Sequence, residues 1–183
     1  LYFGSLIYSK RGTIYAPESV GFTGGRIVCT SAGSEVQYHV TDYLGSVRVV
    51  ADQDGRALEK INYYPFGKRW EAAGQQLTDN RFLFNGKEWQ ATGDVNLLDY
   101  GARMYDPNLG RWFVQDPLYQ MLNPYSFCYS NPVNFMDPTG LWTQSPNGVV
   151  TDNEEDIKQI LNDIADGTFD PKNYAKSSFH YTL

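Results

Sequence analysis

Two Asp-Pro steps, at Asp116 and Asp137, are the places in this chain where residue type could do chemistry. Two carboxylates held close together cannot both ionise, so one keeps a proton while the other stays charged. Such a pair can take and give a proton beside one peptide carbonyl, which is what peptide hydrolysis requires. An Asp-Pro step is also a common turn signal, because the Asp side chain accepts hydrogen bonds from nearby backbone N–H groups. Asp106-Pro107 is a third such step, and there we expect only a turn.

Short strand-like segments separated by glycine-containing turns must position these aspartates. Polar and apolar residues alternate from Glu35 to Val40, the period expected of a half-buried strand. Asp42–Gly45 and Asp52–Gly55 are predicted turns, because glycine adopts a positive φ at no steric cost. Further extended segments are expected at residues 1–8, 25–30, 47–51, 57–64, 81–84, 96–105, 123–129 and 132–136. The segments therefore predict a mainly β fold of short antiparallel hairpins.

Aromatic content supports the same fold class. The chain of 183 residues contains 14 Tyr, 10 Phe and 4 Trp, types that suit pleated, half-buried surfaces. We expect six of these aromatic side chains to be mostly buried between strands: Tyr38, Tyr63, Tyr100, Tyr105, Tyr125 and Phe127. One hairpin cannot bury its own apolar face, so stacked hairpins must share a core.

The segment YHVTDYLGSVRVV, followed by YYPFG at residues 63–67, resembles the last unit of a YD repeat. The next part of the chain resembles the Rhs repeat-associated core of bacterial polymorphic toxins. Five pieces carry that resemblance in order: FNGKE at Phe84–Glu88, TGDVNLLDYGARMYDPNLGRW at Thr92–Trp112, DP at Asp116–Pro117, SNPVNF at Ser130–Phe135 and DPTGL at Asp137–Leu141. The resemblance implies a β-shell built from YD repeats and a core that plugs it.

The same resemblance assigns roles to the two aspartates. In family members that cut their own chain, the aspartates of two DPxGL motifs form the acid–base pair, and the cut follows the second leucine. Asp137 matches the second motif, whereas Asp116 begins DPLYQ, which lacks the Gly and Leu of the first. Arg111 lies at a GR step, where it could tune one carboxylate or orient a carbonyl. The implied cleavage site is the Leu141–Trp142 bond.

Charge and ligand-forming residues narrow the function classes. A net charge of −6 argues against a nucleic-acid surface, which needs clustered Lys and Arg. His39 and His180 are too few and too far apart to suggest a metal site, and no cofactor is expected. Cys29 and Cys128 could be free and buried, or paired. No apolar run approaches the length of a membrane span.

We expect three regions in the chain. Residues 1–80 are predicted to form terminal YD-repeat-like hairpins, 81–141 the Rhs repeat-associated core, and 142–183 a variable C-terminal segment. A helix is predicted near 152–166, because Ile157, Ile160, Leu161 and Ile164 form an apolar stripe at helical spacing. Asp152 could cap that helix, with Glu155 completing a capping box.

The leading functional hypothesis is structural: a terminal or plug segment of an Rhs-type shell that encloses or presents a C-terminal toxin region. The alternative is intramolecular aspartic-type self-cleavage after Leu141, with no activity on an external substrate. A second alternative is a cell-surface recognition or adhesion module. The resemblance implies upstream YD repeats and a C-terminal toxin or cargo segment as partners, with an immunity protein as a further candidate. It also implies a secreted or cell-surface protein.

Overall fold

The chain forms two compact units in a computed structural model. The model describes residues 1–71, 77–119, 121–145, 148–149, 158, 161–163 and 165–168. Unit 1 comprises Leu1–Tyr63 and Arg69–Gly86, and unit 2 comprises Tyr64–Lys68 and Lys87–Leu183. We describe each unit by itself.

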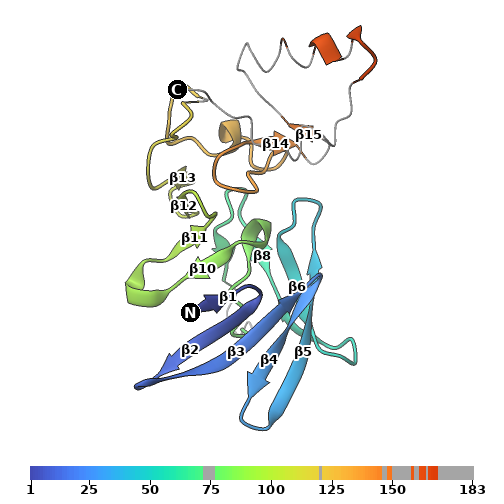
Figure 1. The fold of residues 1–183 in the computed structure, drawn as a ribbon, viewed down its shortest axis with the longest axis vertical. Helices are drawn as coiled ribbons and strands as arrows, with labels where there is room; N and C mark the ends of the chain where they lie inside the picture. The colour runs from blue at the N-terminus through green and yellow to red at the C-terminus, as the bar shows by residue number, and fades with distance from the viewer. Residues whose placement is uncertain are drawn as a thin grey trace. The chain divides into compact units, whose positions relative to one another are not determined.

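Unit 1 is built on a seven-stranded antiparallel sheet whose strands neighbour one another in chain order (Figure 1). The strands are β1 (Tyr2–Phe3), β2 (Leu6–Arg11), β3 (Ile14–Phe22), β4 (Gly25–Thr30), β5 (Gly33–Thr41), β6 (Val47–Ala51) and β7 (Ala57–Lys60). A separate ribbon pairs β8 (Asn62–Tyr63) with β9 (Arg69–Trp70). Each predicted Asp-x-x-Gly turn is present: Gly45 and Gly55 have φ values of 80° and 78°. Sequential hairpins therefore account for the whole sheet.

One face of this sheet buries polar residues beneath the segment at residues 77–83. Arg26 of β4 is 2% exposed and donates to Gln37 Oε1 at 3.0 Å and to Asp79 Oδ1 at 2.5 Å. Glu59 of β7 is equally buried, pairs with Arg69, and accepts the backbone N–H of Thr78 at 2.9 Å. Paired polar side chains thus hold the 77–83 segment on the sheet.

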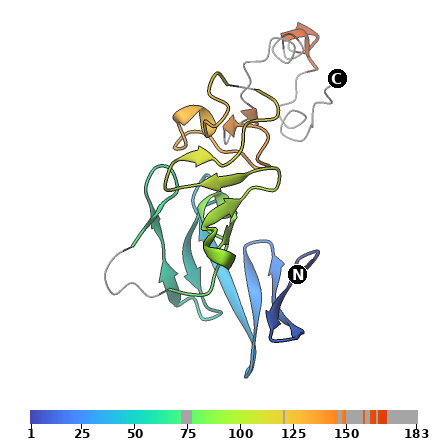
Figure 2. The same cartoon turned by 90° about the vertical axis from the view of Figure 1, so that its left-hand side faces the viewer.

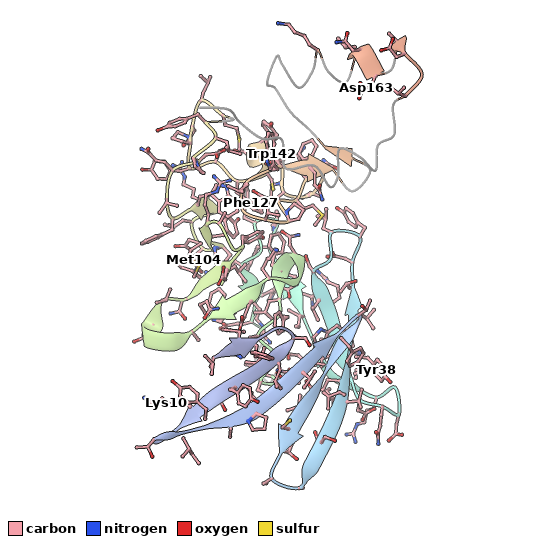
Figure 3. All side chains as sticks on the ribbon, viewed as in Figure 1. Lys10, Tyr38, Met104, Phe127, Trp142 and Asp163 are labelled. Atoms are coloured by element: carbon pink, nitrogen blue, oxygen red, sulfur yellow. The ribbon has the colours of Figure 1, made fainter. Side chains whose placement is uncertain are left out.

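Unit 2 contains a smaller four-stranded antiparallel sheet in the order β10 (Glu88–Gln90), β11 (Leu97–Asp99), β12 (Met104–Asp106) and β13 (Arg111–Trp112). Its core is aromatic. Tyr105 is 0% exposed, and its ring lies 4.1 Å from that of Phe127 and 5.6 Å from that of Trp112. Tyr100 packs edge-on against all three. Figure 3 shows Phe127 among the closely spaced side chains of this unit.

Short elements complete the chain. Three 3-10 turns lie at Phe84–Gly86, Thr92–Asp94 and Cys128–Ser130, and a final ribbon pairs β14 (Gln144–Ser145) with β15 (Gly148–Val149). Of the predicted helix near 152–166, residues 158, 161–163 and 165 are helical, and the others lie outside the described residues. Figure 2 shows this short helical piece near the C-terminal end of the trace. Within the described residues, no helix has both the length and the apolar character needed to cross a membrane.

The predicted mainly antiparallel β fold with one short helix is confirmed. Several local predictions were wrong. The segments 123–129 and 132–136, expected to be extended, form turns, isolated bridges and the 3-10 turn at Cys128–Ser130. Residues 81–84 do not form a strand, because Phe84–Gly86 turns through a left-handed Asn85 with φ 51°. Tyr38 is 46% exposed, because the buried face of β5 carries Gln37 instead. Cys29 and Cys128 are both free.

Candidate active site

Asp137 is at the centre of a tight turn in unit 2. Its carboxylate is 1% exposed, and Oδ1 accepts four consecutive backbone N–H groups: Thr139 at 3.1 Å, Gly140 at 2.7 Å, Leu141 at 3.1 Å and Trp142 at 3.2 Å. Gly140 is required here, because its φ is +76° and a Cβ would lie 2.9 Å from the backbone nitrogen of Arg103. The turn therefore brings the Leu141 and Trp142 nitrogens within hydrogen-bond distance of one carboxylate.

Asp116 lies in a second turn and is also 1% exposed. Its Oδ1 accepts the N–H of Leu118 at 2.9 Å, and its own N–H donates to the Pro124 carbonyl at 2.8 Å. Among the described residues, Asp116 Oδ2 is buried without a hydrogen-bond partner. A buried carboxylate oxygen without a partner is costly, so this atom marks a place where a polar group or water would be stabilised.

Arg103 connects the two aspartates. Its Nη1 lies 3.7 Å from Asp116 Oδ1, and its Nη2 lies 3.4 Å from Asp137 Oδ2. Its Nε donates to the Gly140 carbonyl at 2.5 Å, and its guanidinium lies 4.0 Å from the centre of the Trp112 ring. One planar cation therefore contacts both carboxylates and the turn that carries Leu141.

Arg111 was predicted to tune one carboxylate or orient a carbonyl, but its side chain is exposed, and the arginine that contacts both carboxylates is Arg103. β13 alternates, so Trp112 faces the core at 3% exposure while Arg111 faces outward. Arg111 instead lines an open pocket of about 280 Å³ together with Phe66, Pro107 and Ser126 among others. Strand alternation around Trp112 was the signal that could have excluded Arg111. No spacing in the sequence singled out Arg103.

Lys87 is the second cation of the site. Its ammonium donates to the Pro138 carbonyl at 2.5 Å and lies 5.2 Å from the centre of the Tyr100 ring. The side chain is half-buried, and Lys87 begins the second segment of unit 2. Sequence reasoning noted FNGKE only as part of a family pattern and gave its lysine no role.

Burial dominates the electrostatics of these groups. It raises the pKa of Asp137, and the backbone N–H groups of Thr139, Gly140 and Trp142 together with Arg103 oppose that rise. Burial also lowers the pKa of Arg103 and of Lys87, against the attraction of Asp137 in both cases. The thiol of Cys128 has a raised pKa for the same reason, which makes it a poor nucleophile. Burial therefore favours the protonated form of Asp137.

Comparison with known proteins places the chain in a family. The teneurin YD-shell family model matches residues 24–136, which is more than half of the chain. The chain belongs to the YD-shell family. The predicted relationship to Rhs/YD-repeat shell proteins is thereby confirmed.

Several curated proteins share this YD-shell segment. Toxin subunit YenC1 of Yersinia entomophaga is 35% identical over 115 residues, covering 60% of this chain and 12% of the relative. Salivary gland surface protein 1 of Aedes aegypti is 34% identical over 100 residues, covering 54% of this chain and 3% of the relative. The chain thus spans a small part of the relatives it matches.

Solved structures give the same family relationship. A crystal structure of TcdB2-TccC3 is 28% identical to this chain with a TM-score of 0.61. The match covers 74% of this chain and 7% of the TcdB2-TccC3 chain. The Tc holotoxin pore of Photorhabdus luminescens is 27% identical with a TM-score of 0.64, covering 76% and 7%. A structural role within an Rhs-type shell follows from these matches.

Proposed function

We propose that this chain is the terminal segment of an Rhs-type β-shell and that it closes or plugs the shell around a C-terminal toxin or cargo region. The observation that carries the proposal is the match to TcdB2-TccC3, which extends over about three quarters of the chain. One related structure is described as TcdB2-TccC3 without hypervariable C-terminal region, which supports a variable segment after the core. Upstream YD repeats and the C-terminal region are then its partners, and secretion or cell-surface display is its setting.

The aromatic core of unit 2 gives a test of the plug. In the natural protein that carries this chain, the region after Leu141 should resist added protease. Tyr105→Ala removes a fully buried ring and should open the plug, so that this region is digested. Tyr119→Ala is the control, since Tyr119 is 72% exposed. Digestion of the region after Leu141 at equal rates in all three proteins would contradict enclosure.

Self-cleavage after Leu141 is a second candidate function, favoured by the hydrogen bonds from the Leu141 and Trp142 nitrogens to Asp137. In this reaction a water oxygen bonds to the Leu141 carbonyl carbon while Asp116 takes one water proton. The C–N bond then breaks, and Asp137 gives a proton to the Trp142 nitrogen. The products are a Leu141 carboxyl group and a Trp142 amine. Asp116 Oδ2, buried and unpartnered among the described residues, supports its role as the base.

Intact mass of freshly folded protein decides between cutting and a purely structural role. The wild type should separate into residues 1–141 and 142–183 under denaturing conditions. Asp116→Asn and Asp137→Asn should both stay whole, whereas Asp106→Asn should cut normally. Asp106 is a matched control, because its Oδ1 also accepts two backbone N–H groups in an Asp-Pro turn. If the wild-type chain stays intact, self-cleavage is excluded and only the structural role remains. The cell-surface alternative draws support only from the name of the mosquito relative.

A further inference from the structure

Two carbonyl groups of the Asp137 turn, those of Pro138 and Gly140, accept hydrogen bonds from two different cations, and the Thr139 carbonyl accepts the Ala102 N–H at 3.1 Å. The N–H groups of residues 139–142 converge on Asp137 Oδ1, so the carbonyl groups between them need partners elsewhere. Arg103 Nε takes the Gly140 carbonyl at 2.5 Å, and Lys87 Nζ takes the Pro138 carbonyl at 2.5 Å. The turn is thus fixed on one side by Arg103 and on the other by Lys87.

Lys87 differs from Arg103 in what else it contacts. Arg103 has ion pairs with both carboxylates. Within the described residues, Lys87 instead donates a hydrogen bond to a backbone oxygen and lies over the Tyr100 ring. Tyr100 is 2% exposed within the aromatic core, so that ring is a fixed platform for the ammonium. A charged hydrogen bond combined with a cation–π contact holds the lysine in one place.

We propose that Lys87 is a positioning residue for cleavage: it fixes the Pro138 carbonyl so that the Asp137 turn presents the Leu141–Trp142 bond to the two aspartates. The inference rests on the self-cleavage proposed above. Displacing a peptide bond by about 1 Å from its acid and base can slow its hydrolysis by about a hundredfold. Lys87 also places a positive charge near the Asp137 carboxylate, and this charge interacts with the Asp99 carboxylate as well.

The test measures the cutting rate of the full chain after refolding from denaturant, sampled over time on denaturing gels across a range of pH. Lys87→Met keeps most of the stem over Tyr100 and removes the donor and the charge. We expect it to cut at least about tenfold more slowly, as loss of a charged hydrogen bond predicts. Lys87→Arg keeps a donor and a charge and should recover most of the rate. Lys68→Met is the control, because Lys68 is an exposed lysine of the same unit.

The pH profile separates positioning near Asp137 from a general loss of stability. Removing a positive charge raises the pKa of a nearby carboxyl group. Asp137 must hold a proton to act as the acid, so Lys87→Met should move the alkaline limb of the rate profile to higher pH. A Lys87→Met protein that cuts as fast as Lys68→Met, or a Lys87→Arg protein that cuts as slowly as Lys87→Met, overturns the inference while leaving self-cleavage standing. A wild-type chain that stays intact overturns both.

Discussion

Tyr105 offers the most direct measure of how much the aromatic core stabilises unit 2. The side chain is 0% exposed, its ring packs against Phe127, Trp112 and Tyr100, and its hydroxyl donates to the Phe66 carbonyl at 2.8 Å. Tyr105→Ala removes the ring and leaves a cavity, which should cost about 3–5 kcal/mol of unfolding free energy. Tyr105→Phe keeps the ring and removes one hydrogen bond, which should cost about 1–1.5 kcal/mol.

The assay is denaturant unfolding followed by tryptophan fluorescence and circular dichroism, because the two units need not unfold together. Tyr119→Ala serves as the control in the same unit, since Tyr119 is 72% exposed and its loss should change stability by no more than about 0.5 kcal/mol. The unfolding free energy of Tyr105→Ala should be well below that of Tyr105→Phe, and that of Tyr119→Ala should be close to the wild-type value. If Tyr105→Ala unfolds at the denaturant concentration of the control, the packing described for this ring is wrong.

Two further predictions concern charge. Arg103→Gln leaves two buried carboxylates without their cation and should lower the unfolding free energy by about 3–5 kcal/mol, whereas Arg111→Gln on the exposed face of β13 should change it by less than about 0.5 kcal/mol; equal effects in denaturant unfolding would contradict the ion-pair geometry. Burial, with the charge of Arg26, lowers the pKa of His39 from 6.5 to about 4, so the unfolded chain binds a proton first as pH falls. Stability should therefore decrease between about pH 6.5 and pH 4, by roughly 1–2 kcal/mol after allowance for solvent screening, and His39→Gln should remove that decrease; an unchanged pH dependence in the variant would show His39 to be solvated.

The strands of unit 1 could be predicted from the sequence because their turns are encoded locally. Asp42 Oδ1 accepts the N–H groups of Leu44 and Ser46, and Gly45 supplies the positive φ that closes the turn. Asp52 and Gly55 repeat the arrangement before β7. A residue type and a spacing of three positions therefore suffice to place these two hairpins.

The direction in which β5 faces could not be predicted from the same pattern. Its apolar residues alternate with Gln37 and His39, which suggested that Tyr38 faces inward. Gln37 is 6% exposed and Tyr38 is 46% exposed, because Arg26 brings a hydrogen-bond partner to the glutamine. A polar side chain can be buried at little cost once it is paired. That pairing depends on Asp79, more than fifty positions from Arg26 in the chain, and no local pattern encodes it.

Some residues of the candidate site could be predicted from the sequence, and others could not. The sequence and its family resemblance singled out Asp116 and Asp137, and the fold brings both to one guanidinium. The sequence could not single out Arg103, because this arginine lies in a bend just before β12 and no motif or spacing distinguishes it. Its partners Asp116 and Asp137 are distant in the chain, and Asp137 is 34 positions away. Arg111 was the arginine adjacent to a recognisable motif, and adjacency in sequence proved to be a poor guide to contact.

Asp137 also shows how small a change separates a turn from a candidate catalyst. Asp42, Asp52 and Asp106 each accept two backbone N–H groups in half-buried turns, as any capping aspartate does. Asp137 uses the same device through Oδ1, but it is 1% exposed, and its Oδ2 faces Arg103 with Asp116 at the other end of the guanidinium. Burial raises the pKa of Asp137. If the chain cuts itself, the chemistry therefore comes from placing an ordinary turn in a poorly hydrated site beside a second carboxylate. Replacing either Asp116 or Arg103 should then remove the chemistry, whereas the Asp137 turn could still form through its own backbone hydrogen bonds.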